Sequence, residues 1–247
     1  MTTAFARFGS GPPLLLAHPL VFSKRYFLGA KEVFGARFDT VAVDLRGHGD
    51  NEGEVDLDAA ADDIGAVLDA CGWSAARLGG TSLGAAVVLR FALRRPERVV
   101  RLVQDLPGFG PGSRRPPERV AAMAEAFAKA DFEAAAQAIT EGYPPARAQA
   151  WSDALRSDWS GYDPARLGPK LAKAVRAAAA WRVAEPWPSA LAALTVPTEI
   201  LAVKGDPTHP WEIAETMAAT LPDARLHARV PSLAPGKIAE QWISVLA

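Results

Sequence analysis

The segment ARLGGTSLGAAVVLRFALRRP, residues 76–96, decides how this chain folds. A short apolar run ends at Gly79, and a helical pattern begins at Leu83 and stops before Pro96, which cannot continue a helix. The five residues at the junction of strand and helix, GTSLG (80–84), have the form Gly-x-Ser-x-Gly. In this setting the form indicates a tight turn that lifts the hydroxyl of Ser82 above the edge of a sheet. The segment therefore predicts a strand, a strained turn and a helix.

Five further short apolar runs are candidate strands, in addition to residues 76–79. They lie at residues 13–17, 40–44, 99–103, 199–203 and 225–230. Amphipathic stretches alternate with them, because apolar residues recur at helical spacing from Leu57 to Cys71 and from Ile238 to Leu246. This alternation predicts an α/β fold with a mostly parallel central sheet flanked by helices.

The pattern changes between residues 111 and 188. This segment is rich in alanine, shows helical patterns broken by Pro116-Pro117 and Pro144-Pro145, and contains no strand pattern. Trp151, Trp159 and Trp181 fall within it. We therefore expect a helical lid over residues 111–188, inserted into a core domain of residues 1–110 and 189–247. The tryptophans can line a pocket or can only pack lid helices together, and the sequence leaves both open.

The composition and charge of the chain limit the kinds of binding partner to expect. The 27 basic and 28 acidic residues give a net charge of -1, which favours a small neutral substrate over nucleic acid or an anionic membrane. Signal-peptide and membrane-span patterns are absent, and Cys71 is the single cysteine, so we expect a cytoplasmic protein without disulfides. No phosphate-binding loop or metal-ligand cluster is visible, and we expect neither cofactor nor metal. The oligomeric state is not indicated.

Further stretches carry a resemblance to a known family. Residues 14–19, LLLAHP, are similar to a strand that ends in His-Gly in the α/β-hydrolases, and residues 43–50, VDLRGHGD, to that family's Asp-x-Arg-Gly-His-Gly-x-Ser loop. Residues 196–210 resemble the strand and loop that carry its catalytic acid. With the Gly-x-Ser-x-Gly turn, the resemblance covers about residues 14–110 and 194–247 and points to the lid-bearing serine hydrolase branch.

The resemblance implies roles for residues around the turn. It makes Ser82 the nucleophile and Asp206 the catalytic acid, with the backbone amides of Leu83 and Leu20 as the donors that stabilise an oxyanion. The lid is covered by no motif of the family.

The chain departs from the family at the general base. A serine hydroxyl needs a base within hydrogen-bond reach, and the family supplies a histidine shortly after the last strand. The corresponding loop here, residues 230–236, contains none. His209 is our candidate replacement, although it can equally bind substrate or lie on a surface loop, and His227 is less suited because it lies within a strand. Without a base, Asp206 could act directly through water.

We expect the residues that contact the substrate to surround Ser82. These are His18, Thr81, Asp105, Trp151, Trp159 and Trp181. In the family, positions equivalent to His18 and His48 normally hold loops near the site. Asp105 is either a second carboxylate at the site or a turn residue before Pro107 and Gly108.

Three functions are compatible with these residues. The first is a serine hydrolase acting on a small, largely apolar ester, lactone or thioester, with an atypical or missing base. The second is a non-hydrolytic enzyme of the same fold, a cyclase, isomerase or lyase, that uses acidic residues in the lidded cavity. The third is a catalytically silent binding protein. We rank the hydrolase first because the turn, the acid loop and the oxyanion strand are all present.

Overall fold

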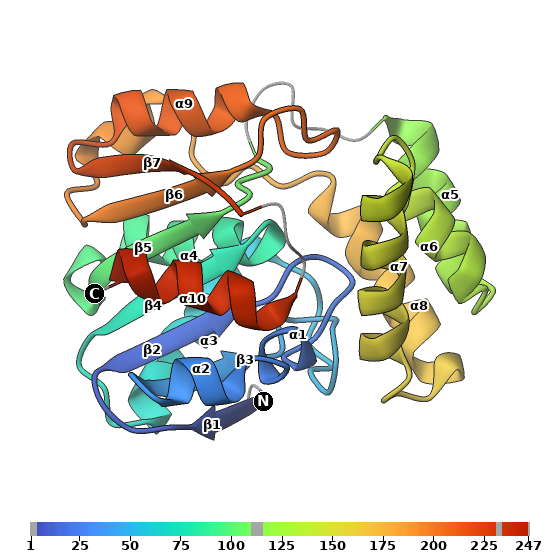
Figure 1. Cartoon of the computed structure of the whole chain (residues 1–247), viewed down its shortest axis with the longest axis horizontal. Coiled ribbons are helices and arrows are strands. Elements are labelled where there is room, and N and C mark those ends of the chain that lie inside the picture. Colours follow the sequence, from blue (N-terminus) through green and yellow to red (C-terminus); the bar gives the residue numbers. More distant parts are fainter. Residues whose placement is uncertain (1–3, 110–115, 231–233, 247) are drawn as a thin grey trace.

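The central feature of the fold is one sheet. A computed structural model describes residues 4–109, 116–230 and 234–246, and within these ranges seven strands pair in the order β1-β3-β2-β4-β5-β6-β7. The strands are β1 (Phe5–Phe8), β2 (Pro13–Ala17), β3 (Asp39–Val43), β4 (Ala76–Thr81), β5 (Val99–Asp105), β6 (Thr198–Ala202) and β7 (Ala224–Ala228). β1 is antiparallel to β3, and the other pairs are parallel (Figure 1). The predicted α/β fold is confirmed.

Six of these strands coincide, to within two residues at each end, with the six apolar runs of the sequence. β1 was not predicted. It is a short edge strand with half-buried residues on either side of the exposed Arg7, which pairs with Asp39 at the start of β3. A strand of only four residues is too short for its pattern to stand out in the sequence.

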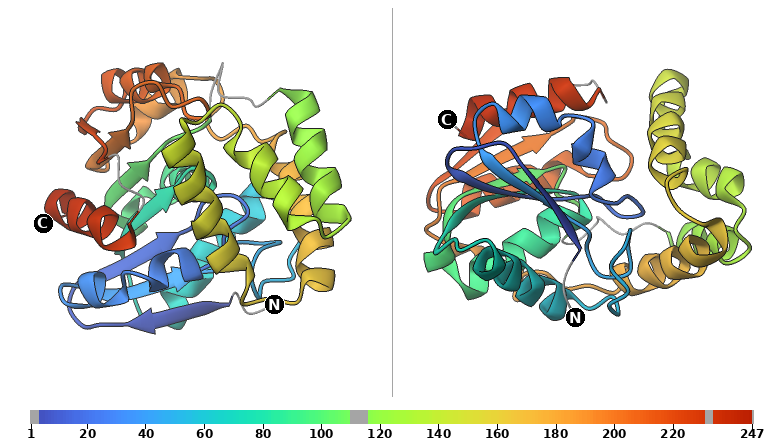
Figure 2. Two further views of the ribbon diagram at one scale, coloured as in Figure 1. Left: turned by 45° about the vertical axis from the view of Figure 1, so that its right-hand side comes forward. Right: turned by 90° about the horizontal axis from the view of Figure 1, so that it is seen from below.

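Helices cover both faces of the sheet (Figure 2). One apolar cluster joins the sheet to α3 (Leu57–Ala70), α4 (Leu83–Arg94) and α9 (Trp211–Thr220). A second cluster joins the opposite face to α1 (Arg25–Leu28), α2 (Lys31–Gly35) and α10 (Pro235–Leu246). Short 3₁₀ turns lie at Pro96–Arg98 and Ser189–Ala193. The central strands are therefore buried on both faces, as their continuous apolar runs require.

Four helices between β5 and β6 form a separate group beside the sheet (Figure 1). They are α5 (Pro117–Ala128), α6 (Phe132–Thr140), α7 (Pro145–Trp159) and α8 (Pro164–Ala178). We call residues 117–178 the helical insertion. It has an apolar core of its own, in which Phe127, Leu155 and Leu171 are fully buried. The predicted boundary at residue 110 lies outside the described residues.

Polar contacts tie the helical insertion to the sheet domain. Trp159 Nε1 donates to the carbonyl of Val21 at 2.7 Å, and Lys170 Nζ donates to the carbonyl of Gly49 at 2.9 Å. The buried carboxylate of Asp158, near the end of α7, accepts the amide and the hydroxyl of Ser23 at 3.2 and 3.0 Å. Such directional contacts fix the orientation of the insertion, which apolar packing alone would leave less defined.

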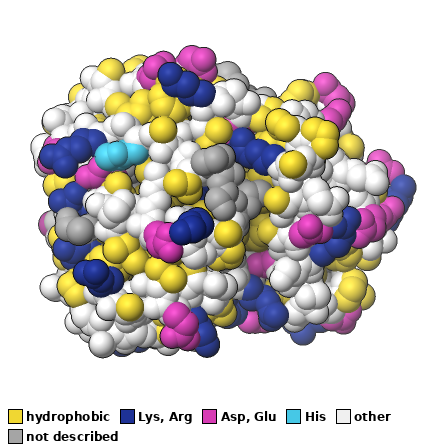
Figure 3. All heavy atoms as spheres, in the orientation of Figure 1, with side chains coloured by type: hydrophobic (Ala, Val, Ile, Leu, Met, Phe, Trp, Pro, Cys, Tyr) yellow, Lys and Arg dark blue, Asp and Glu magenta, His cyan; other side chains and the backbone are white. Residues whose placement is uncertain are grey.

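The surface carries charges of both signs. Basic and acidic side chains are interspersed over the face shown in Figure 3, in keeping with the net charge of -1. Among the residues that the structure describes, no helix has the length and apolarity needed to cross a bilayer.

Asp158 makes the stability of the protein depend on pH. Burial raises the pKa of Asp158 to about 6, although hydrogen bonds from Ser23 act in the opposite direction. The folded state thus binds a proton that the unfolded state lacks between about pH 4 and 6, so this carboxyl costs about 3 kcal/mol of stability as the pH rises through that window. We expect the wild type to lose this amount relative to Asp158→Asn, whose side chain cannot ionise. Urea unfolding of both proteins between about pH 4 and 7 measures the difference, and parallel pH curves would contradict the prediction.

Candidate active site

Ser82 lies in a strained turn, residues 80–84, that we call the Ser82 turn. The serine follows β4 directly, and its φ of 52° lies in a region that residues other than glycine rarely adopt. A Cβ atom at Gly80 would collide with the backbone of Gly84, and one at Gly84 would collide with the carbonyl of Ala17 on β2. The two glycines of the Gly-x-Ser-x-Gly pattern are therefore required by close backbone approach, as their placement between strand and helix predicts.

Buried hydrogen bonds from β5 hold the Ser82 turn. The amide of Ser82 donates to the carbonyl of Asp105 at 2.8 Å, and the hydroxyl of Thr81 donates to the Asp105 carboxylate at 3.0 Å. Arg229 Nε donates to the other carboxylate oxygen at 2.6 Å. We expected Asp105 to contact the substrate. It is instead fully buried and lines neither of the cavities at Ser82.

His209 reaches Ser82 from the loop that follows β6. Its Nε2 lies 2.9 Å from Ser82 Oγ, and its Nδ1 lies 3.1 Å from Asp206 Oδ1. An ionised carboxylate only accepts hydrogen bonds, so Nδ1 carries the proton and Nε2 is left to accept the serine hydroxyl. The structure thus brings the three residues together in one chain of hydrogen bonds. His227 instead contacts Glu199 at 2.6 Å.

The carboxylate of Asp206 is fully buried and is surrounded by donors. Oδ1 accepts the backbone amides of Thr208 and His209 at 2.9 and 2.8 Å, in addition to the imidazole. Burial raises the pKa of Asp206, but the hydrogen bonds from His209 and from the two amides outweigh it and hold this pKa well below its usual range. Asp206 therefore stays ionised, which is the state that orients His209.

Two residues of the helical insertion also bind Asp206. Arg147, in the first turn of α7, donates to Oδ2 at 2.6 Å, and Tyr143 donates its hydroxyl to Oδ1 at 3.2 Å. The Arg147 guanidinium stacks 4.9 Å from the ring centre of Tyr143. Sequence reasoning missed both residues, because they belong to no motif and lie about 60 positions from Asp206. The break at Pro144-Pro145 was the nearest signal in the sequence.

Backbone amides beside Ser82 are free to bind an oxyanion. Within the part of the chain that the structure describes, the amides of Leu83 and Leu20 have no hydrogen-bond acceptor. Leu83 is the first residue of α4, and the first amides of a helix lack partners within it. Both residues line a cavity together with Ser82. Their assignment as oxyanion donors remains a prediction, and it agrees with this placement.

His18 lies under the site and away from the cavities. The ring is fully buried, and burial lowers its pKa to about 4, so the imidazole is neutral. Nε2 accepts the amide of Leu45 at 3.0 Å, which leaves Nδ1 to donate to the carbonyl of Pro19 at 2.8 Å. Both ring nitrogens are thus engaged in holding two loops, and the structure does not place His18 where we expected it, in contact with a substrate.

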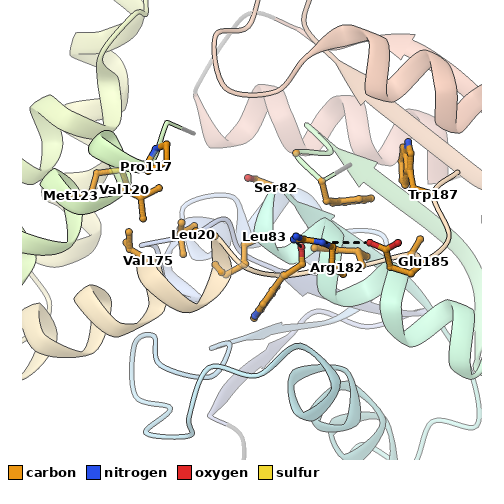
Figure 4. A pocket seen from close by; sticks show the side chains of 18 of the residues that line it. Leu20, Ser82, Leu83, Pro117, Val120, Met123, Val175, Arg182, Glu185 and Trp187 are labelled. Atoms are coloured by element: carbon orange, nitrogen blue, oxygen red, sulfur yellow. Dashed lines mark hydrogen bonds and ion pairs between the residues drawn. The ribbon is translucent and has the colours of Figure 1, made fainter. Parts of the chain in front are cut away.

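Two cavities meet at Ser82. The large cavity has a volume of about 760 Å³ and extends between the helical insertion and residues 181–187, with Ser82 on its wall (Figure 4). The small cavity has a volume of about 40 Å³ and lies on the side of His209. Trp181 lines the large cavity, and Thr81 and Trp151 line the small one. Trp159 is packed in the core of the insertion and lines neither.

Among residues 4–109, 116–230 and 234–246, no group of three or more histidine, cysteine, aspartate or glutamate side chains is placed to hold a metal ion.

A family model described as the alpha/beta hydrolase family matches residues 14–241. The chain belongs to this family. It is 31% identical over 172 residues to an N-formylmaleamate deformylase from Pseudomonas putida, covering 65% of the chain and 62% of that relative. It is 34% identical over 102 residues to a pimeloyl-[acyl-carrier protein] methyl ester esterase from Nitrosomonas europaea, covering 38% and 37%. The matched part thus spans less than two thirds of either relative.

Solved structures of alpha/beta hydrolases share the fold. The enol-lactonase from Burkholderia xenovorans superposes with a TM-score of 0.78 over 99% of this chain and 96% of its own, at 16% identity. The resemblance inferred from the sequence motifs is confirmed at the level of family and fold.

Gly108 provides a test of the contact between His209 and Ser82. A Cβ atom at this position would lie 2.8 Å from His209 Cδ2, so Gly108→Ala must push the imidazole. Because a displacement of about 1 Å can cost about 100-fold in rate, we expect a fluorophosphonate to modify Ser82 at least about 10-fold more slowly. Gly236→Ala is the matched control, since nothing lies within 4 Å of its added Cβ. Equal labelling rates in the two variants would contradict this geometry.

Arg147 provides a test of the charge balance at Asp206. Charged and titratable groups around this carboxylate are Arg147, Tyr143, His209 and, at longer range, Arg229. Arg147→Gln removes the cation that binds Asp206 Oδ2 at 2.6 Å and leaves this buried carboxylate less firmly held. Because Asp206 orients His209 in the proposed site, we expect Ser82 to be labelled about 10-fold more slowly. Arg147→Lys keeps a cation and should lose less of the rate, whereas equal labelling rates for the wild type and both variants would contradict the prediction.

Proposed function

We propose that this protein is a serine hydrolase that cleaves a small, largely apolar ester, lactone or thioester. The contact of His209 Nε2 with Ser82 Oγ at 2.9 Å, backed by Asp206 on the other ring nitrogen, carries the proposal. This contact supports His209 as the general base, in place of the histidine that the family carries after the last strand and that residues 230–236 lack. A serine without such a base would be nearly inert, because its loss costs about six orders of magnitude in turnover.

The proposed reaction uses each group in one role. Ser82 Oγ adds to the substrate carbonyl and passes its proton to His209, while the amides of Leu83 and Leu20 bind the oxyanion. His209 then donates that proton to the departing oxygen or sulfur, and an acyl-serine remains. Water adds to the acyl-serine, gives a proton to His209 and releases the acid, after which Ser82 regains its proton. Asp206 orients the imidazole throughout and stays ionised.

The names of the relatives support a reaction at a carbonyl group. They denote a deformylase, a methyl ester esterase and an enol-lactonase. These three activities differ in the bond that is cleaved but share a carbonyl carbon as the target. They support the general chemistry and do not select among ester, lactone and thioester.

The two buried acids are poorly suited to the non-hydrolytic alternative. Proton transfer by Asp105 and Asp206 would require at least one carboxylate that faces a cavity without a fixed counter-ion. Asp105 is paired with Arg229 at 2.6 Å, and Asp206 is paired with Arg147 at the same distance. These ion pairs, the hydrogen bond from Thr81 to Asp105 and those that Asp206 accepts on Oδ1 occupy the oxygens that would receive a proton, so we retain hydrolysis as the proposal.

We also propose that the helical insertion serves as the lid of this site. Val120 and Met123 from α5 and Val175 from α8 line the large cavity, opposite the Ser82 turn (Figure 4). Burial between two such layers excludes water from an apolar substrate and strengthens the electrostatic contacts around the reacting carbonyl.

Fluorophosphonate labelling tests the proposed roles directly. We expect rapid labelling of the wild type, none for Ser82→Ala, and a loss of several orders of magnitude for His209→Gln, because the serine then has no base. His227→Gln removes a histidine that contacts Glu199 and should label like the wild type. A wild type that resists labelling, or a His209→Gln variant that labels normally, would contradict the assignment.

A further inference from the structure

The two cavities that meet at Ser82 differ in their relation to the proposed base. His209 lines the small cavity, whereas the walls of the large cavity do not include it. In acyl transfer from an ester, the protonated base must reach the oxygen of the departing alcohol. The cavity that contains His209 is therefore the one that has to hold the alcohol part, and the acyl part is left with the large cavity.

Building on the proposed hydrolase function, we infer that the substrate is an ester of a very small alcohol, methyl or ethyl, with a bulky apolar acyl group. The inference follows from the volumes. A cavity of about 40 Å³ exceeds the roughly 10–15 Å³ that one water requires and leaves room for a methoxy or ethoxy group. The large cavity, at about 760 Å³, lies within the range of pockets that enclose whole ligands.

The walls of the small cavity resist expansion. Leu106, Met123, Ile139 and Trp151 are all buried, and Ile139 and Trp151 belong to the packed core of the helical insertion. Phe22 also lines this cavity and packs against Trp151 with ring centres 5.7 Å apart. Protein interiors accommodate extra methylene groups at a cost in strain, so this cavity selects against longer alcohols.

The large cavity suits an extended apolar acyl group. Figure 4 shows Val120, Met123 and Val175 at one end, and Trp187 at the other. At this second end Arg182 and Glu185 form an ion pair at 3.6 Å, with both side chains about half exposed. The large cavity thus has one end lined by apolar side chains of the helical insertion, and a half-exposed ion pair on its other side.

Each chemical step fits this division of space. Attack by Ser82 forms the Oγ–carbon bond, and the carbon–oxygen bond to the alcohol then breaks as His209 supplies the proton. Departure of methanol or ethanol leaves the small cavity free for one water beside His209. That water is placed to add to the acyl-serine, and release of the acid restores the protein.

Two ester series test the inference on the wild-type protein. In the first, the acyl group is fixed as octanoyl and the alcohol is methyl, ethyl, propyl or butyl. In the second, methyl esters of acetic, butyric and octanoic acids are compared. We expect kcat/KM to fall about 10-fold or more from methyl to butyl in the first series, and to rise along the second.

Ile139→Ala tests whether the small cavity sets the preference. Removal of this side chain enlarges the small cavity, and we expect the butyl-to-methyl ratio of kcat/KM to rise about 10-fold. Leu155→Ala is the matched control, because Leu155 is buried in the same core and lines neither cavity. It should lower stability in a similar way and leave the ratio unchanged. If Ile139→Ala fails to fold, Ile139→Val makes the same change on a smaller scale.

The outcomes separate this inference from the proposed function. Equal rates for methyl and butyl esters, or a preference for acetates of long alcohols, would overturn the inference while leaving a labelled Ser82 and a working hydrolase. Absence of both labelling and ester hydrolysis would overturn the proposed function, and the inference with it. A methyl preference that Leu155→Ala relaxes as much as Ile139→Ala would also count against the small cavity.

Discussion

The site depends on the way Asp206 folds back on its own loop. Its carboxylate accepts the amides of Thr208 and His209 and the imidazole of His209, all within four residues. The family resemblance assigns acid and base to different loops, whose relative position depends on the whole last crossover of the sheet. Here Asp206 and His209, the proposed acid and base, belong to one turn, so their mutual geometry is local. What the rest of the fold must supply is the placement of this turn against Ser82.

Two arginines neutralise the buried carboxylates at the edge of the sheet. Asp105 and Asp206 are fully buried carboxylates, and an isolated buried charge would be strongly unfavourable. Arg229, just past the end of β7, neutralises Asp105 beneath the Ser82 turn, and Arg147 neutralises Asp206. The end of the last strand, near which the family places its histidine, thus helps to hold Ser82 in position. In the proposed hydrolase the base, His209, lies on the preceding loop, and the space near the end of β7 is occupied by the ion pair of Arg229 with Asp105.

Local sequence predicted those parts of the site that depend on neighbours along the chain. The strained turn at Ser82 could be predicted because its glycines form a recognisable motif, and the proximity of Asp206 and His209 because they are three residues apart. The expected substrate contacts of His18 and Asp105 did not appear, since their positions near the sheet's edge did not reveal that both side chains point into buried networks. Contacts such as Arg147 with Asp206 depend on how the insertion docks, which no local pattern encodes.

Helix α7 shows why this information was hidden. Arg147, Trp151 and Leu155 follow one another at intervals of four, which places them on one face of the helix, and Asp158 and Trp159 continue that face. From the first turn of the helix to the last, residues of this face bind Asp206, line the small cavity and fill the core of the insertion. At the end of the helix they form hydrogen bonds with Ser23 and Val21. Charged residues at both ends of the stripe make it look like a solvent-exposed face in the sequence. Because one rigid helix carries all four contacts, the electrostatics of Asp206 and the size of the small cavity are set together by how that helix docks.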